Sequence, residues 1–320
     1  PRVRRQRQMC IRDRSKEDTK CKLAEKWIPK TVVDSELQVN ENDTQIHIKG
    51  REFAYTIDKR TALFTEMKFA GREYLNHPME LNIWRAPTDN DMYIKSEWKK
   101  AHYDKAYTRA YTTEVVQGKH GVKITSHASV VAETVQKILD VTITWKIEAA
   151  GKIDADIAVT KDDEFPDLPR FGVRMFLDKK LSAVRYFGMG PQESYCDKHQ
   201  AASHGLYRAD VGDLHEDYIR PQENGSHYDC EYVELNNSRY GIVASAEKAF
   251  SFNASYYTQE ELEKKTHNYE LIESDSVVFC VDYALNGIGS NSCGPVVLEQ
   301  YRFDDVLFRF QFTLIPYVKG

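Results

Sequence analysis

The sequence has 320 residues, of which 29% are charged, 41% hydrophobic and 12% aromatic, a balance typical of a folded globular protein rather than a disordered one. The formal net charge of −5 argues against a general nucleic-acid binder. No run of 18 apolar residues occurs in the sequence, which argues against a membrane-spanning helix. We therefore expect neither nucleic acid nor a membrane as a partner.

The cysteines are scattered, and no two of them have the CxxC spacing of a metal site. This usage is typical of reduced thiols, and the first residues lack the apolar stretch of a secretory signal. We therefore expect a cytoplasmic protein with no metal site in this chain. The six cysteines are Cys10, Cys21, Cys196, Cys230, Cys280 and Cys293.

Residues 1–15 differ from the rest because they contain six arginines and almost no apolar periodicity. Such a segment can be a basic arm for nucleic acid or an anionic surface, or a solvated or non-native leader, and we favour the leader. Residues 16–43 are polar and are interpreted as a linker. One domain is then expected over residues 44–320.

From residue 44 onward, apolar and polar residues alternate with a period of two. Alternation places one face of a strand in a core and the other in water, which is the pattern of antiparallel sheets. The domain is longer than a seven-stranded sandwich needs, so we predict an all-β fold with a large antiparallel two-sheet sandwich. The clearest stretches are 46–48, 141–147, 153–159 and 306–314.

Helical signals are sparse. Residues 258–265 begin with Thr258 and Glu261 at the spacing of a capping box, which predicts a short surface helix. Residues 95–101 predict another turn or two of helix. No glycine-rich phosphate loop follows a predicted strand, and no internal repeat of 20–50 residues is present in the sequence.

The first of four polar loops begins at Trp84 and Arg85 and continues to Asp89, Asn90 and Asp91. Arg85 presents a rigid guanidinium fork, and the three acids and amides follow four to six residues later. One interpretation is an ordered loop closed by an internal Arg–Asp pair, with Trp84 in the core. The other is a polar rim for a ligand or a partner.

In the second loop, two glycines and a proline end a strand and direct Gln192 and Glu193 out of the sheet. A glutamate at such an edge acts as a general base where burial tunes it, but it more often pairs with a nearby arginine. We expect Glu193 and Arg85 to anchor their loops rather than to catalyse.

The third loop contains Arg220, Glu223 and Asn224 within residues 218–227. The fourth, residues 286–295, is composed of small polar residues and glycines, which suit a close approach to a sugar. No GxSxG elbow accompanies the serines, and the spacing of His199 and His204 is a weak metal signal. Spacing alone cannot place the two facing carboxylates that a glycosidase needs.

Taken together and in this order, these segments resemble the C-terminal domain of β-galactosidases of glycoside hydrolase family two. The resemblance extends from about residue 44 to residue 317, and it implies a β-supersandwich with the architecture of galactose mutarotase. The matching segments are WRAPTDND (84–91), LPRFG (168–172), GMGPQESYCDK (188–198), RPQENG (220–225) and GIGSNSCGP (287–295).

In that family the catalytic glutamates lie on a (β/α)₈ barrel upstream of this domain, and no alternating βα segments occur in this sequence. The resemblance therefore implies a small chain or C-terminal domain that carries no catalytic residue of its own. Its partners would be the large chain or the upstream domains, in an oligomeric enzyme that hydrolyses β-D-galactosides such as lactose. Residues 16–43 would be the tail of an immunoglobulin-like domain, and the whole enzyme would need Mg²⁺ and Na⁺.

In some family members the fourth loop reaches the active site and presents a tryptophan, on which a sugar stacks. In this sequence Cys293 occupies that position, and a thiol offers no aromatic face. The resemblance makes Ser290, Asn291, Ser292 and Cys293 the candidate substrate-binding residues. Two other functions stay open: a free-standing enzyme of the aldose-epimerase kind with a Glu/His pair, and a carbohydrate-binding module without chemistry.

Overall fold

The structure is a computed structural model that describes residues 37–134, 136–289 and 292–319. The basic leader and residues 16–36 of the expected linker lie outside these residues. The described residues form seventeen strands, in one sheet of five and one of twelve, and each strand pairing is antiparallel. The predicted all-β, antiparallel fold with two sheets is therefore confirmed.

The five-stranded sheet is a meander in which each strand pairs with the next. Its first strand lies inside the segment 16–43 that was expected to be a linker. The reason is that this edge strand is polar and mostly exposed, so it has no apolar alternation that could reveal it. The strands are β1 (Gln38–Glu41), β2 (Gln45–Lys49), β3 (Phe53–Asp58), β4 (Leu63–Phe69) and β5 (Arg72–Glu73).

The twelve-stranded sheet forks at its longest strand, β15. The first part of β15, Tyr240–Ser245, pairs with β17, whereas its last part, Ser251–Ser255, pairs with β16. One branch continues β17-β10-β9-β8-β7, and the other continues β16-β11-β6. On its other side β15 pairs with β14, which leads to β12 and β13.

The bounds of these strands are β6 (Leu75–Asn82), β7 (Tyr107–Gly118), β8 (Gly121–Val131), β9 (Leu139–Glu148), β10 (Ile153–Lys161), β11 (Arg170–Asp178), β12 (Ala183–Gly190), β13 (Ser203–Asp210), β14 (Ser226–Asn236), β15 (Tyr240–Ser255), β16 (Ser276–Leu285) and β17 (Leu307–Val318).

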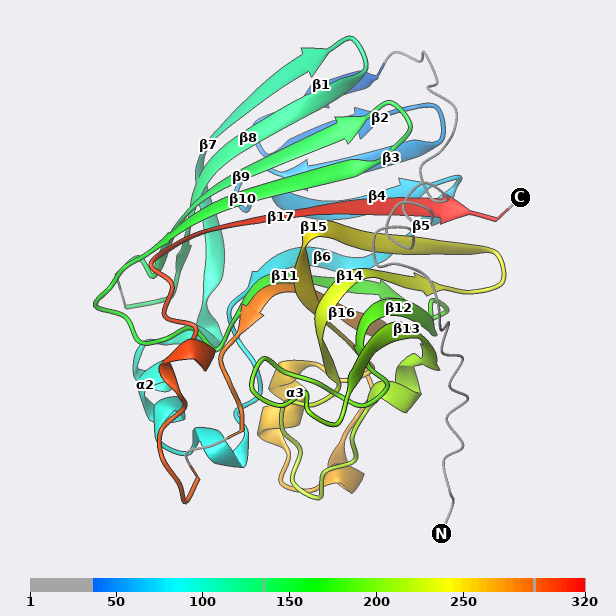
Figure 1. The fold of residues 1–320 in the computed structure, drawn as a ribbon. Coiled ribbons are helices and arrows are strands. Elements are labelled where there is room, and N and C mark those ends of the chain that lie inside the picture. Colours follow the sequence, from blue (N-terminus) through cyan, green and yellow to red (C-terminus); the bar gives the residue numbers. More distant parts are fainter. Residues whose placement is uncertain (1–36, 135, 290–291, 320) are drawn as a thin grey trace.

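The five-stranded sheet lies against the branch that contains β9 and β10 (Figure 1). Trp145 of β9 is fully buried between the two layers, where its indole packs edge-on against Phe64 with ring centroids 4.9 Å apart. Its Nε1 donates to the carbonyl of Ala62 at 2.8 Å, so the buried indole N–H has a partner. The Tyr55 hydroxyl donates across the same interface to the carbonyl of Gly151 at 2.7 Å.

The two predicted helices are confirmed as α2 (Ile94–Lys100) and α3 (Gln259–Lys264). Thr258 caps α3, because its hydroxyl accepts from the amide of Glu261 at 3.1 Å. The second half of the predicted capping box is replaced, since the Glu261 carboxylate accepts from the amide of Ile272 instead. No helix in the described ranges is both long and apolar enough to cross a membrane. The short 3₁₀ helices are η1 (Asp89–Asp91), η2 (Tyr103–Lys105), η3 (Val211–Leu214), η4 (Asn268–Glu270) and η5 (Glu299–Tyr301).

Candidate functional site

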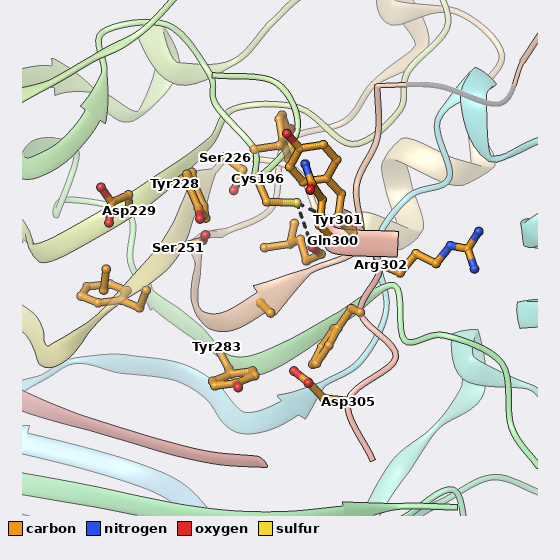
Figure 2. Close-up of a pocket in the computed structure, with 16 residues that line it drawn as sticks. Cys196, Ser226, Tyr228, Asp229, Ser251, Tyr283, Gln300, Tyr301, Arg302 and Asp305 are labelled. Atoms are coloured by element: carbon orange, nitrogen blue, oxygen red, sulfur yellow. Dashed lines mark hydrogen bonds between the residues drawn. The ribbon is translucent and has the colours of Figure 1, made fainter. Parts of the chain in front are cut away.

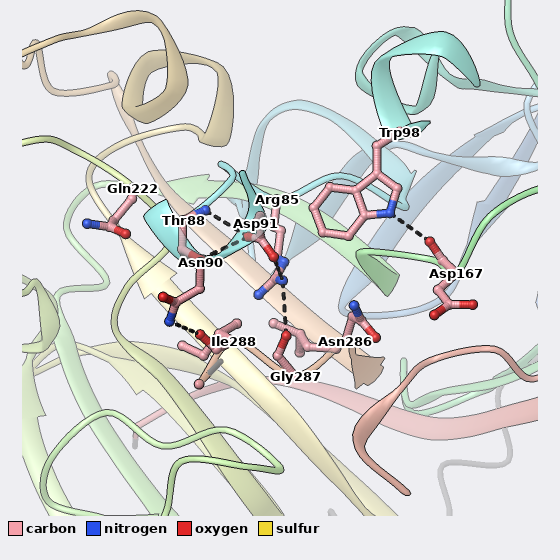
Figure 3. Close-up of polar contacts among 12 residues, drawn as sticks. Arg85, Thr88, Asn90, Asp91, Trp98, Asp167, Gln222, Asn286, Gly287 and Ile288 are labelled. Carbon is pink, nitrogen blue, oxygen red and sulfur yellow. Dashed lines mark hydrogen bonds and ion pairs between the residues drawn. The ribbon is translucent and has the colours of Figure 1, made fainter. Parts of the chain in front are cut away.

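The fold brings the four polar loops together, although they are far apart in the sequence. The first loop touches the fourth where the Asn90 side-chain amide donates to the carbonyl of Ile288 at 2.6 Å (Figure 3). It touches the third where the amide of Glu223 donates to the carbonyl of Ala86 at 3.1 Å. We call this group of loops, together with Arg170 and Asp282, the loop cluster.

Arg85 closes the first loop from within. Its guanidinium is fully buried, and Nη2 donates to Asp91 Oδ1 at 2.8 Å and lies 3.4 Å from the carbonyl of Gly287. The other oxygen of Asp91 accepts from the backbone amide and the hydroxyl of Thr88. Trp84 is 3% exposed, so both the expected Arg–Asp pair and the expected buried indole are present. These groups are occupied by one another rather than presented to solvent.

The outer contacts of the first loop are weaker. The amide of Asp89 donates to the side chain of Gln222 at 3.1 Å, and the exposed carboxylate of Asp89 lies 3.9 Å from the Arg220 guanidinium. An exposed pair at this distance contributes little to stability. Asn224, by contrast, is buried, and its side chain accepts from the amide of Glu216 and donates to the carbonyl of Gln222. Arg220 and Asp89 therefore lie on the solvent side of the loop cluster.

Glu193 joins the second loop to the third, but its ionic partner is not the arginine that was expected. Its carboxylate accepts from Lys198 Nζ and from the Tyr218 hydroxyl, each at 2.5 Å, and from the amide of Gly225 at 2.9 Å. Burial raises the pKa of Glu193, but these hydrogen bonds outweigh burial and hold the pKa below its ordinary value. A carboxylate in this state is a poor general base. The neighbouring Gln192 is exposed.

At the centre of the loop cluster Arg170 binds two acids that sequence reasoning did not pair with it. Its Nη2 donates to Glu223 Oε1 at 2.8 Å, and its Nε lies 3.3 Å from Asp282 Oδ1, where all three side chains are buried. Burial raises the pKa of Glu223, and it raises the pKa of Asp282 to about 7. The guanidinium of Arg170 lowers both pKa values but does not cancel the effect of burial.

A glycine makes room for this ion pair. Gly172 of β11 lies opposite Asp282 of β16 at a register shift, and a Cβ atom there would lie 2.4 Å from Asp282 Oδ1. Any side chain at this position would displace the carboxylate or the backbone of β16. The LPRFG segment of the sequence therefore has two structural functions, since Arg170 supplies the cation and Gly172 the space for its partner.

Asp197 holds the beginning of the fourth loop. Its two carboxylate oxygens accept from the backbone amides of Ile288 and Gly289, at 3.1 and 2.7 Å. The candidate binding residues Ser290 and Asn291 lie outside the described residues. Beyond them the side chain of Cys293 is exposed, and Ser292 is half-buried beside it.

The histidine beside Glu193 cannot serve as the second member of an epimerase-like pair. His227 is 1% exposed, and its Nδ1 donates a hydrogen bond to the carbonyl of Met189 at 3.1 Å. Burial lowers its pKa to about 4, so the imidazole is neutral and inaccessible at neutral pH. Over the ranges that the structure describes, no three His, Cys, Asp or Glu side chains are grouped to hold a metal ion.

The sequence of this chain is similar to part of the sequence of known β-galactosidases. Residues 49–314 match the family described as beta galactosidase small chain. The beta-galactosidase of Actinobacillus pleuropneumoniae is 44% identical over 289 residues, which is 90% of this chain and 28% of that protein. The beta-galactosidase of Staphylococcus xylosus is 33% identical over 282 residues, which is 88% of this chain and 28% of that protein. The chain therefore spans about 28% of the length of these relatives.

Solved structures with a similar course of the chain include galactose 1-epimerase from Lactobacillus acidophilus NCFM, with a TM-score of 0.47 and 7% identity over 89% of this chain and 99% of that one. A galactose mutarotase related enzyme from Lactobacillus acidophilus has a TM-score of 0.41 and 11% identity, over 89% of this chain and 100% of that one. The sequence match to the small chain covers well over half of the 320 residues, and this chain therefore belongs to the beta galactosidase small chain family.

Proposed function

We propose that this chain is the non-catalytic part of an enzyme that hydrolyses terminal β-D-galactosides such as lactose, and that it completes the assembly and the rim of the active site. The observation that carries the proposal is the family match over residues 49–314 combined with a span of only 28% of each relative. The partner is the large chain, or the upstream domains of the same polypeptide.

The chemistry of the loop cluster supports a structural rather than a catalytic part in hydrolysis. A glycosidase needs two carboxyl groups that reach the substrate, one as an acid and the other as a nucleophile or base. In the loop cluster Asp91 is bound by Arg85, Glu223 by Arg170, and Glu193 by Lys198 and Tyr218. Each of these carboxylates is occupied by its own neighbours, which suits a rigid support for loops.

The direct contribution to the active site would come from the fourth loop. Asp197 fixes the backbone of Ile288 and Gly289, so the described start of the fourth loop is held to the second loop. The exposed Cys293 lies further along the fourth loop. We infer that Ser290, Asn291, Ser292 and Cys293 border the aglycone side of the active site when the large chain is present.

We expect the purified chain alone to show no β-galactosidase turnover, because hydrolysis of a glycoside without a catalytic carboxyl pair is too slow to detect. Mixing it with the portion of the Actinobacillus pleuropneumoniae enzyme that lacks the matching 28% should generate activity. The measurement is the release of nitrophenol from a nitrophenyl galactoside, with each part alone as the control. Turnover by this chain alone, prepared from a host without β-galactosidase, contradicts the proposal, as does a mixture no more active than its parts.

Replacing Cys293 with Trp tests the position of the fourth loop. A stacked aromatic side chain contributes about 0.5–1.5 kcal/mol beyond burial, so the KM for lactose in the assembled enzyme should fall roughly threefold to tenfold. A substrate with a small leaving group should respond less, because it lacks the sugar that would stack. A matched Ile272→Trp variant, at a residue that is 68% exposed and lies outside the four loops, controls for a nonspecific effect of the added ring. Unchanged KM values for both substrates would place the loop away from the active site.

A further inference from the structure

A cavity of about 310 Å³ lies beside the loop cluster, and the proposed function makes no use of it (Figure 2). Its walls come from β14, β15 and β16, from the residues that follow β12, and from the segment 300–305 that begins in η5. Its volume lies within the range of small-molecule sites. The side chains that carry the argument are Tyr228, Asp229, Ser251, Tyr283, Gln300 and Asp305.

The lining combines aromatic rings with carboxylates. Tyr228 and Asp229 lie on one side of the space, and Tyr283 and Asp305 lie on another (Figure 2). The cationic head group of Arg302, the arginine of the lining, points away from the centre in the same view. Two carboxylates without an inward cation disfavour an anionic ligand. The cavity therefore suits a molecule with apolar faces and many hydroxyl groups, or a cation.

Both aromatic walls are held in place before any ligand arrives. The ring of Tyr228 stacks on the imidazole of His199, with centroids 5.6 Å apart and an angle of 29° between the planes. The ring of Tyr283 stacks on Phe308, with centroids 4.8 Å apart and an angle of 15°. Rings that are already ordered lose little conformational freedom on binding, which favours recognition by stacking.

A β-bulge places two consecutive residues of β14 in this one cavity. Neighbouring side chains of a regular strand point to opposite faces of the sheet, so Tyr228 and Asp229 would normally diverge. The register of β14 with β15 shifts between His227 and Cys230, and Asp229 has a φ of 53°. Bulges redirect side chains, and a non-glycine residue with positive φ persists only where its surroundings hold it. The backbone is thus arranged to bring a ring and a carboxylate to the same space.

Ser251 adds a polar group to the lining. The residue is 5% exposed and lines the cavity from β15. A serine hydroxyl group both donates and accepts hydrogen bonds, so it suits a ligand hydroxyl group. The exposed Gln300 at the mouth offers a second donor and acceptor.

We propose that this cavity binds a neutral monosaccharide and that this binding needs no large chain. The tyrosine rings would pack against the C–H face of a pyranose, and Asp229 and Asp305 would accept hydrogen bonds from its hydroxyl groups. Ser251 and Gln300 favour a sugar over an organic cation, because a quaternary ammonium group has no acceptor for their hydrogen atoms.

The test is a calorimetric titration of the full 320-residue chain with D-galactose, with D-glucose and tetramethylammonium as further probes. We expect saturable galactose binding in the low millimolar range. Asp305→Asn should weaken it about tenfold, because the neutral amide oxygen accepts a weaker hydrogen bond than the carboxylate does. Tyr228→Ala should weaken it by a similar factor, whereas Tyr228→Phe, which keeps the ring, should stay within about threefold. Tyr269→Ala, at a ring that is 80% exposed and outside the cavity, is the matched control.

Each remaining outcome overturns the proposal. These outcomes are no saturable binding of either sugar by folded wild-type chain, galactose binding that Asp305→Asn and Tyr228→Ala leave unchanged, and binding of tetramethylammonium in place of sugar. Circular dichroism verifies that each variant is folded, and the exposed Asp305 provides a substitution that does not disturb the core. Because the titration uses this chain without the large chain, its failure is distinct from failure of the reconstitution experiment.

Discussion

Replacing Arg170 with Ala is expected to lower the free energy of unfolding by about 3–5 kcal/mol, the usual effect of removing one member of a buried ion pair. The substitution leaves the carboxyl groups of Glu223 and Asp282 buried without their cation. Urea unfolding at neutral pH measures the loss. In the assembled enzyme the same variant should reduce activity chiefly through impaired association, because Arg170 is fully buried and cannot touch a substrate.

The matched control is Arg309→Ala. Arg309 also binds an aspartate, Asp156, but this pair lies on the exposed face of β10 and β17. Pairs in such positions contribute little, so this variant should unfold nearly as the wild type does. A third variant, Arg170→Met with Glu223→Gln and Asp282→Asn, removes the charges together and should recover much of the stability. Equal effects of Arg170→Ala and Arg309→Ala would show that burial does not decide the strength of these pairs.

The second large effect concerns pH. Arg85 and Arg170 provide two positive charges for three buried carboxyl groups, those of Asp91, Glu223 and Asp282. These five side chains together are neutral only when one of the three carboxyl groups keeps its proton. Asp282 is the group that the structure favours for this, since burial raises its pKa from 3.8 to about 7.

The folded chain therefore holds a proton on Asp282 at pH values where the unfolded chain has released it. Between about pH 4 and pH 7 the unfolded state binds fewer protons, so the free energy of unfolding falls as the pH rises, by a few kcal/mol in total. Above pH 7 both states have lost the proton and this contribution no longer changes. We expect Asp282→Asn to remove most of this dependence, because only the smaller contribution of the raised pKa of Glu223 remains. Urea unfolding at several pH values measures it.

Asp275→Asn serves as the control for the pH experiment. The Asp275 carboxylate is exposed, and hydrogen bonds from Ser276 and His77 hold its pKa below the ordinary value. A group with a lowered pKa makes the free energy of unfolding rise with pH, which is the opposite of the effect of Asp282. Asp275→Asn should therefore leave the fall in stability between pH 4 and pH 7 in place. If wild-type stability rises with pH across that interval, the assignment of the shared proton to Asp282 is wrong.

Local patterns in the sequence were sufficient for the architecture. Alternation predicted the antiparallel strands, and the interval between Thr258 and Glu261 predicted the cap of α3. The Arg85–Asp91 pair was also within reach of sequence reasoning, because its members are six residues apart and close the same loop. Each of these features depends on residues that are near neighbours along the chain.

The ion pairs at the centre of the loop cluster could not be predicted from the sequence. Arg170 and Asp282 belong to strands that meet only when the sheet has formed, and no periodicity links them. We expected an arginine partner for Glu193 because glutamates at strand edges often pair with arginine. Instead, Lys198, which is near in the sequence, and Tyr218, which is distant, donate hydrogen bonds to it. β1 was missed because a polar edge strand has no buried face to mark it. Such contacts depend on which distant segments meet in the folded chain, and a single sequence does not show this.

The course of the large sheet also has a consequence for synthesis of the chain. β17 lies between β10 and β15, and its residue Leu314 is opposite Ile153 of β10. On the ribosome, β10 is therefore complete long before its neighbour exists, and the growing polypeptide carries two unpaired strand edges in the meantime. Such edges invite association with other chains. Nascent-chain aggregation should thus depend on how fast translation proceeds from β10 to β17, and it should cease once β17 has emerged.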